Sequence, residues 1–319
     1  MFLKKISTAI AVAASVAFSG GAAQSAETLI IATGSTGGTS YFVGSAIAQV
    51  VNKHSDTVRI EVLPTGGTTE TSGFILRGKA QFGLLTPSAA IEAYSGKGPF
   101  EGNAVENLRA VWGGYYNYHS FIAPSAKGYT SIADLKGKRV GLCPTGTTCS
   151  KIAIATLEAA GISVDDVEGQ FLSFNEQVAS LSDGKLDAAV MFSGVPGAAL
   201  LNITSQMDVD FINLGDDIQS KVNAQNAYFL KVDLPAGVYR GQDEAVSSLG
   251  TEVLFVGAAE VSANVIKEIS DVLYAHPEEL KSIMPLMAFF TPDNPLSAQT
   301  PAIPRHEGFE AYLKDTGKI

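Results

Sequence analysis

A short apolar run breaks abruptly into glycines and hydroxyl-bearing residues at positions 29–42, which read LIIATGSTGGTSYF. The apolar half predicts a β-strand, the middle a loop, and the end the start of a helix. Glycine lets a backbone turn sharply and approach a ligand, and the first N–H groups of a helix have no partner within that helix. We therefore expect a small polar ligand to contact this segment, through Ser35, Thr36, Gly37, Gly38, Thr39 and Tyr41.

The loop does not have the spacing of a dinucleotide-binding fingerprint. Gly34 is followed by Gly37 and Gly38, whereas that fingerprint requires G-x-G-x-x-G. The second predicted strand ends in Leu63 and Pro64, where a ribose-binding carboxylate would be needed. A phosphate-binding G-x-x-x-x-G-K-[ST] motif does not follow either. The alternative to a ligand contact is a glycine turn that only packs the helix.

Two later segments repeat the chemistry of this loop, and each follows a predicted strand. They are residues 65–71, TGGTTET, and residues 145–150, TGTTCS. Each alone is explained by ordinary helix capping, but three such loops favour a shared site for an anion or carboxylate. Ser88 follows a further strand, although a proline turn also explains it. The expected contacts are Thr65, Gly66, Gly67, Thr68, Ser88, Thr145, Gly146, Thr147 and Thr148.

The order of predicted elements is βαβαβ, followed by a second α/β unit. We therefore expect an α/β fold of two Rossmann-like lobes, joined by a β hinge and facing a shared cleft. The chain crosses near residues 117–123 and returns through residues 247–256. Lobe 1 then comprises residues 27–118 and 251–319, and lobe 2 comprises residues 119–250. Helices over about 262–284 and 304–314 are expected to pack back on lobe 1.

Aromatic residues near the expected crossing are further candidates. Tyr115 and Tyr116 combine an apolar ring with a phenolic hydrogen-bonding group, which suits a cleft wall. Phe192 lies at the end of a predicted strand and is a candidate of the same kind. Burial in the core is the alternative for all three side chains.

The N-terminus has the pattern of a secretory signal peptide over residues 1–26, with two lysines, an apolar run and small residues at the end. No later segment is long and apolar enough to span a membrane. We therefore expect a periplasmic protein without stable membrane insertion. In an oxidising compartment the two cysteines, Cys143 and Cys149, are expected to form a disulfide, with two buried thiols as the alternative.

The formal net charge of −10 makes nucleic acid and anionic membranes unfavourable partners. His54, His276 and His306 are scattered singly in the sequence, so we expect no metal site. For His119, a structural hydrogen bond is favoured over catalysis. No G-x-S-x-G motif or Cys–His pairing is present, and we expect no cofactor, no enzymatic activity and a monomer.

Arginine is absent from the three glycine and hydroxyl loops. A carboxylate ligand would therefore be held mainly by backbone N–H groups, hydroxyls and helix dipoles.

Several motifs, in order along the chain, resemble the TAXI family of solute-binding proteins of TRAP transporters. They are ATGSTGGTSYF at 32–42, TGGT at 65–68, LKGKRV at 135–140, LEAAGI at 157–162, PAGVYRGQDE at 235–244 and IPRHEG at 303–308. The resemblance departs at residues 143–149, CPTGTTC, and at residues 115–118, YYNY, so the cleft wall is altered there.

The resemblance implies a type II periplasmic-binding-protein architecture that closes on a small organic acid. Glutamate, glutamine and 2-oxoglutarate are ligands associated with the family, and delivery would be to the TRAP membrane subunits. By motif position the contacts would fall at 36–41, 65–68 and 146–148. Alternatives are an ABC-type substrate-binding protein and a secreted hydrolase or transferase that uses the same cleft.

Overall fold

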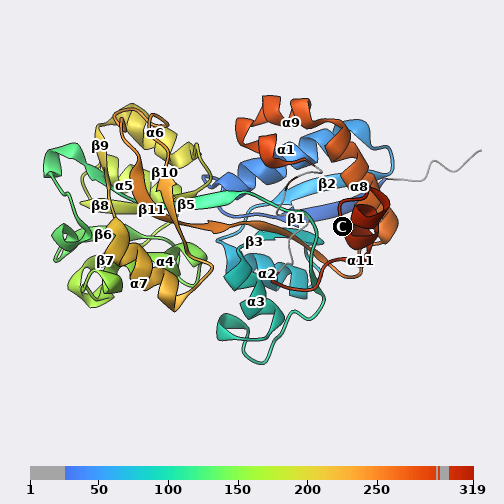
Figure 1. The fold of residues 1–319 in the computed structure, drawn as a ribbon, viewed down its shortest axis with the longest axis horizontal. Coiled ribbons are helices and arrows are strands. Elements are labelled where there is room, and N and C mark those ends of the chain that lie inside the picture. Colours follow the sequence, from blue (N-terminus) through green and yellow to red (C-terminus); the bar gives the residue numbers. More distant parts are fainter. Residues whose placement is uncertain (1–25, 292–293, 295–301) are drawn as a thin grey trace, which may run out of the picture.

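The computed structural model describes residues 26–291, 294 and 302–319. The predicted signal peptide, apart from Ala26, lies outside the described residues. The chain forms two β-sheets with helices on their faces, arranged as two lobes side by side (Figure 1).

The first sheet has the strand order β2-β1-β3-β12-β4. Its first three strands in sequence are parallel, and each is followed by a helix, as the βαβαβ pattern predicts. β12 runs antiparallel to both β3 and β4. The elements are β1 Glu27–Ala32, α1 Thr39–His54, β2 Val58–Leu63, α2 Thr68–Leu76, β3 Phe82–Leu85, α3 Pro87–Tyr94, β4 Leu108–Ala110 and β12 Leu254–Ala258.

The second sheet has the order β10-β11-β5-β8-β6-β7, and β9 pairs with β5. β6, β7 and β8 are parallel, whereas β5 is antiparallel to its neighbours β8, β9 and β11. The elements are β5 Tyr116–Pro124, β6 Arg139–Leu142, α4 Thr148–Ala159, β7 Glu168–Phe171, α5 Phe174–Ser182, β8 Ala188–Ser193, α6 Ala198–Gln206, β9 Val209–Ile212, α7 Gly215–Gln225, β10 Leu230–Leu234 and β11 Val246–Glu252.

The central strands of the second sheet, β5 and β8, are buried on both faces. Phe121 and Val190 belong to one hydrophobic cluster, and the adjacent Ile122 and Ala189 belong to another. Successive side chains of a strand point to opposite faces, so β5 and β8 separate two apolar layers. This explains the near-continuous apolar runs in their sequences.

The chain passes between the sheets twice, from β4 to β5 and from β11 to β12. Tyr116 pairs with Glu252 at the start of the β5–β11 ladder. The second sheet therefore begins a few residues earlier, and ends slightly later, than the predicted range of 119–250. Both crossings lie close together in space, since the two strands are hydrogen-bonded neighbours (Figure 1).

The C-terminal helices return to the first lobe. They are α8 Ala263–Ala275, α9 Pro277–Ile283 and α11 Glu307–Asp315, with a short 3-10 turn, η5, at Pro285–Phe289. Leu273, Leu280 and Leu313 join the core cluster of the first sheet. The single helix expected over 262–284 is interrupted at His276, because Pro277 cannot donate the next helical hydrogen bond.

Within residues 26–291, 294 and 302–319, no helix combines the length and the apolar character that crossing a membrane requires.

Candidate functional site

A cavity of about 90 Å³ lies between the two lobes. Its walls come from the loops that follow β1, β2, β3 and β6, together with the two crossing segments. All these loops lie at the carboxyl ends of strands, where α/β folds bind ligands. The volume is smaller than the roughly 150 Å³ of a cavity that holds benzene, so the site suits a compact ligand.

Four helices begin at this cavity directly after the strands β1, β2, β3 and β6, and α5 contributes its first residue, Phe174. Gly38 and Thr39, at the start of α1, line the cavity wall, and so do Gly67 and Thr68 at the start of α2. Thr86, the N-cap of α3, also lines the wall, and none of these three helices has a side-chain cap. A helix N-terminus has a partial positive charge, and its first N–H groups lack partners in the helix. The convergence of three uncapped N-termini therefore creates a site suited to an anion.

The fourth helix, α4, is capped internally. The Thr147 hydroxyl accepts a hydrogen bond from the Ser150 N–H at 3.1 Å. Similarly, the Glu70 carboxylate accepts from the Gly66 N–H at 2.6 Å, just before α2. These two N–H groups are already used within the protein, so the contribution of α4 to ligand binding is smaller than that of α1.

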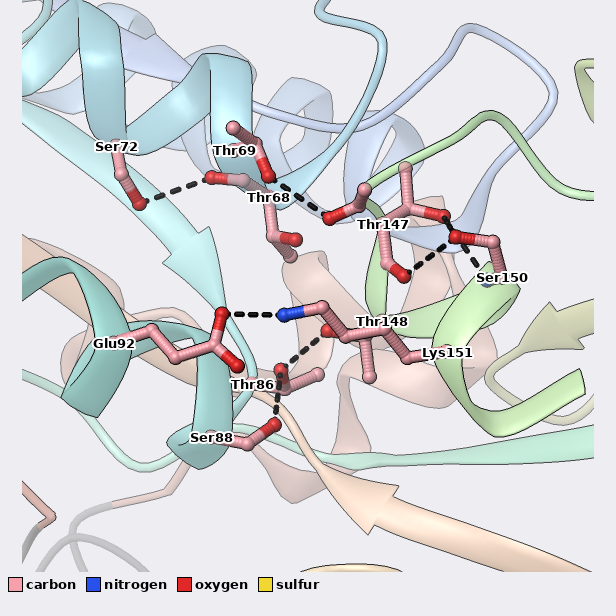
Figure 2. A network of polar contacts seen from close by, with 11 residues as sticks. Thr68, Thr69, Ser72, Thr86, Ser88, Glu92, Thr147, Thr148, Ser150 and Lys151 are labelled. Carbon is pink, nitrogen blue, oxygen red and sulfur yellow. Dashed lines mark hydrogen bonds and ion pairs between the residues drawn. The ribbon is translucent and has the colours of Figure 1, made fainter. Parts of the chain in front are cut away.

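Polar contacts hold the two lobes together around the cavity (Figure 2). The Thr69 hydroxyl donates to the Gly146 carbonyl at 2.9 Å, and the Thr86 and Thr148 hydroxyls lie 2.7 Å apart. Lys151 forms an ion pair with Glu92 in the same region. On the other side, the Gly194 N–H donates to the Thr39 hydroxyl at 3.0 Å.

The predicted residues fall into two groups. About half of them line the cavity, from both lobes: Ser35, Gly38, Thr39, Gly66, Gly67, Thr68, Thr147, Thr148 and Phe192. The structure thus brings together the loops after β1, β2 and β6.

The others do not line this cavity: Thr36, Gly37, Tyr41, Thr65, Ser88, Tyr115, Tyr116, Thr145 and Gly146. Thr36 and Thr145 are exposed on the outside of their loops. The Thr65 hydroxyl is buried and lies 2.9 Å from the Thr71 hydroxyl. Seven of these positions belong to the predicted loops or to the helix starts that follow them, and Tyr115 and Tyr116 lie at the expected crossing.

The two tyrosines at the crossing have different environments. Tyr115 is buried, and its hydroxyl lies 2.9 Å from the Ser40 hydroxyl, while burial raises the pKa of this phenol. Tyr116 is exposed and pairs across the ladder with Glu252. Tyr115 therefore supports the wall from behind, through Ser40, which does line the cavity.

Sequence reasoning missed several wall residues, and Asn117 is the most informative. It is only 7% exposed, lines the cavity, and its Oδ1 atom is buried without a hydrogen-bond partner. An unpaired buried polar atom in a native fold calls for an explanation, and a bound ligand supplies one. The only feature of the sequence that points to Asn117 as a wall residue is its position at the expected crossing between the lobes. Four more wall residues, Gly34, Ser40, Thr71 and Thr86, belong to segments that the sequence points to, and Ser40 lies within the expected contact range 36–41. The wall residues outside those segments are Leu84, Leu85, Pro144, Phe174 and Val253.

Cys143 and Cys149 form a disulfide, as predicted, and both cysteines line the cavity. The bond closes the loop that leads from β6 into α4, so it fixes the shape of this wall. No charged side chain lines the cavity among the described residues. A ligand there would be held by N–H groups, hydroxyls and the Asn117 amide, together with apolar contacts.

His119 has no place in this site. Its ring is fully buried, its Nε2 atom lies 3.5 Å from the Thr156 hydroxyl, and desolvation lowers its pKa to about 3. The ring is therefore neutral, and it packs edge-on against Phe121 at 5.1 Å. These contacts fit the structural role that the sequence favours.

Solved structures with a similar fold include three that match most of this chain. PhnD1 from Prochlorococcus marinus, in complex with methylphosphonate, has a TM-score of 0.55 at 11% identity, over 91% of this chain and 99% of that chain. The ligand binding component of an ABC-type import system from Staphylococcus aureus, with zinc bound, has a TM-score of 0.51 at 10% identity, over 92% and 93%. An ancestral arginine-binding protein bound to arginine has a TM-score of 0.50 at 15% identity, over 80% and 96%.

At these identities the similarity establishes the fold, which is that of type II periplasmic binding proteins. The sequence gives the narrower assignment, because the model of the NMT1-like family matches residues 31–317. The chain belongs to the NMT1-like family.

Proposed function

We propose that this protein is a periplasmic solute-binding receptor that captures a small organic acid or amino acid in the cavity between its lobes. The observation that supports this most is the convergence of the uncapped N-termini of α1, α2 and α3 on a cavity with no charged side chain in its described wall. Such a site stabilises one negative charge without a salt bridge. Glutamate- and 2-oxoglutarate-like acids, which have a second carboxylate, join this class on the strength of the motif resemblance alone.

Asn117 supports a more specific ligand. Its unpaired Oδ1 atom accepts hydrogen bonds, while the helix N-termini donate them. The best-matched ligand has an anionic group and a separate hydrogen-bond donor, as an amino acid or a hydroxy acid has. A plain alkyl carboxylate would leave Oδ1 unpaired.

The proposed location follows from the export signal predicted over residues 1–26 and from the Cys143–Cys149 disulfide, which is typical of an oxidising compartment. A receptor of this kind passes its ligand to a membrane component. The motif resemblance favours TRAP membrane subunits, and an ABC importer is the alternative that the Staphylococcus aureus neighbour supports. Reconstituted uptake with each class of membrane component would separate the two.

Thermal-shift and calorimetric screens of the mature chain test the receptor function. The panel contains monocarboxylates, dicarboxylates, 2-oxoacids, hydroxy acids and amino acids. A ligand at 100 times its Kd stabilises the protein by about 2.7 kcal/mol, which raises Tm by roughly 5–10 °C. No shift with any compound would refute the proposal, and turnover of a bound compound would favour the hydrolase or transferase alternative.

Two threonine variants provide the matched pair for the site. Thr68 lines the cavity and Thr36 is exposed outside it. Thr68→Val removes a hydroxyl from the wall, so the affinity should fall about 3- to 10-fold, as expected for one hydrogen bond. Thr36→Val makes the same chemical change and should leave the affinity unchanged.

A further inference from the structure

A second cluster of polar side chains lies in the first lobe, outside the cavity walls. His54 ends α1, His276 joins α8 to α9, and Glu279 lies in the first turn of α9. The two imidazole rings stack with their centroids 3.7 Å apart. The His54 Nε2 atom lies 2.8 Å from Oε2 of Glu279, although the two residues are 225 positions apart in the sequence. His54 and His276, which stand singly in the sequence, are thus neighbours in the fold.

These three side chains have the donor set of a metal centre. One ligand atom from each lies within 4.8 Å of the other two. Two imidazoles and one carboxylate are typical protein ligands of an open zinc site, with water in the fourth position. Zinc bonds of about 2.0–2.1 Å at tetrahedral angles place ligand atoms about 3.3 Å apart. The contact between His54 and Glu279 therefore needs to widen by about 0.5 Å. A metal ion lies in the plane of each imidazole that binds it, so the two rings also need to turn out of their parallel stack.

The surroundings prepare the carboxylate for this role. Each oxygen of the Glu279 carboxylate has one partner, Lys53 on Oε1 and His54 on Oε2. The Lys53 ammonium holds Oε1 at 2.7 Å, which orients Oε2 toward the His54 ring. In metal sites, residues that do not touch the ion commonly hydrogen-bond to a ligating side chain and fix its orientation. The side chains of His54 and Glu279 are about one quarter exposed, so a metal ion can reach them and the side chains can adjust.

We propose that His54, His276 and Glu279 bind a divalent transition-metal ion, with Zn²⁺ as the preferred ion. The ion would fasten the end of α1 to the junction of α8 and α9. From that junction α9 leads to η5, where the Phe289 ring packs on Tyr115 at 5.3 Å, behind the cavity wall. The metal site thus reinforces the packing of the C-terminal helices on the first lobe.

Zinc titration of the tag-free mature chain against a chromophoric chelator tests the site. We expect one Zn²⁺ per chain, and affinity losses of at least ten-fold in His276→Gln and in Glu279→Gln. The matched control is Glu278→Gln, which removes the same charge from the same helical turn, because Glu278 is exposed and outside the cluster. This control should bind zinc as tightly as the unaltered protein.

Two further measurements separate metal binding from a purely structural role. Co²⁺ should give the visible absorption of a tetrahedral site, and Glu279→Gln should abolish it. Zinc should raise Tm in the unaltered protein and in Glu278→Gln but not in Glu279→Gln. Zinc affinity should also weaken as pH falls, because imidazole must be neutral to bind a metal. Equal zinc affinity in Glu279→Gln and the unaltered protein, or no stoichiometric binding, would overturn the proposal, whatever the outcome of the ligand screens.

Discussion

Asn117 offers the sharpest test of the cleft, because one substitution should change affinity and stability in different directions. Its buried Oδ1 has no partner, and the residue directly opposite on β11, Thr251, also has a buried unpaired hydroxyl. Asn117 lines the cavity, whereas Thr251 does not. The perturbation is Asn117→Leu, which keeps the size of the side chain and removes its polar atoms.

The expected magnitudes follow from the cost of unpaired polar atoms. Leaving a buried acceptor unpaired costs about 1–3 kcal/mol. Asn117→Leu should therefore leave the free energy of unfolding of the ligand-free protein unchanged or raise it by up to that amount. A ligand that donates to Oδ1 loses about 0.5–1.5 kcal/mol if the bond is neutral and about 1.5–3 if it is charged. Affinity should then fall between about 2-fold and 150-fold.

Two assays separate these effects. Urea unfolding without ligand gives the stability, and isothermal titration with the best compound of the screen gives the affinity. Thr251→Val is the control, because it also removes a buried unpaired polar atom with little change in shape. It should raise stability by a similar amount and leave affinity unchanged.

A loss of stability in the ligand-free Asn117→Leu protein would show that the side chain has a structural partner. Unchanged affinity would remove Asn117 from the site. Equal losses of affinity in Asn117→Leu and Thr251→Val would show that the crossing strands, and not this amide, govern binding.

Three further predictions concern closure, pH and the disulfide. Gly67 has φ +138°, and a Cβ there would lie 2.5 Å from Cγ2 of Thr147 on the other lobe. Gly67→Ala should therefore hinder closure of the two lobes and lower the ligand affinity measured by calorimetry at least ten-fold. Desolvation raises the pKa of Glu252 from 4.5 to about 7, so folding favours its protonated form. The free energy of unfolding should therefore fall as pH rises from about 4.5 to about 7, and then level off. The expected fall is about 1–2 kcal/mol, which allows for the partial exposure of the side chain. Reduction of Cys143–Cys149 should lower the free energy of unfolding by about 2 kcal/mol, measured by urea unfolding with and without reductant.

Each of these has a control and a refuting outcome. Gly161→Ala is strained in the same way, at φ +79°, but meets no atom within 4 Å, so it should cost stability and not affinity. Glu252→Gln should remove the decline in stability over that pH range, and an unchanged decline would assign it to another group. The double variant Cys143→Ser, Cys149→Ser should not respond to reductant. A reductant effect that persists in it would exclude the disulfide as the cause.

The elements that the sequence predicts well are those with local signals. The alternation of residues 58–63 and the glycine breaks after β1 and β2 depend only on neighbours in the chain, and they appear as β2 and as the loops that begin α1 and α2. β9 and β10 were not anticipated. β10 lies at the edge of its sheet and is mostly exposed, so its sequence lacks a buried apolar run.

The site was predicted at the level of loops and less well at the level of side chains. Thr145 and Thr148 belong to one predicted loop, yet only Thr148 faces the cavity. The direction of a side chain depends on the turn and on the opposite lobe, and neither is visible in a residue pattern. Phe174 reaches the wall from the start of α5, which no sequence signal marked.

The sequence by itself therefore determined the α/β class, the two-lobed plan and the glycine and hydroxyl loops at strand ends, because these depend on interactions between residues close together in the chain. Only the tertiary structure decided which of those loops close on one another, that Asn117 lies in the cavity wall, and that His54 meets His276 and Glu279. These contacts join side chains that can be more than two hundred residues apart in the sequence, and only the packing of the folded chain fixes the distances between them.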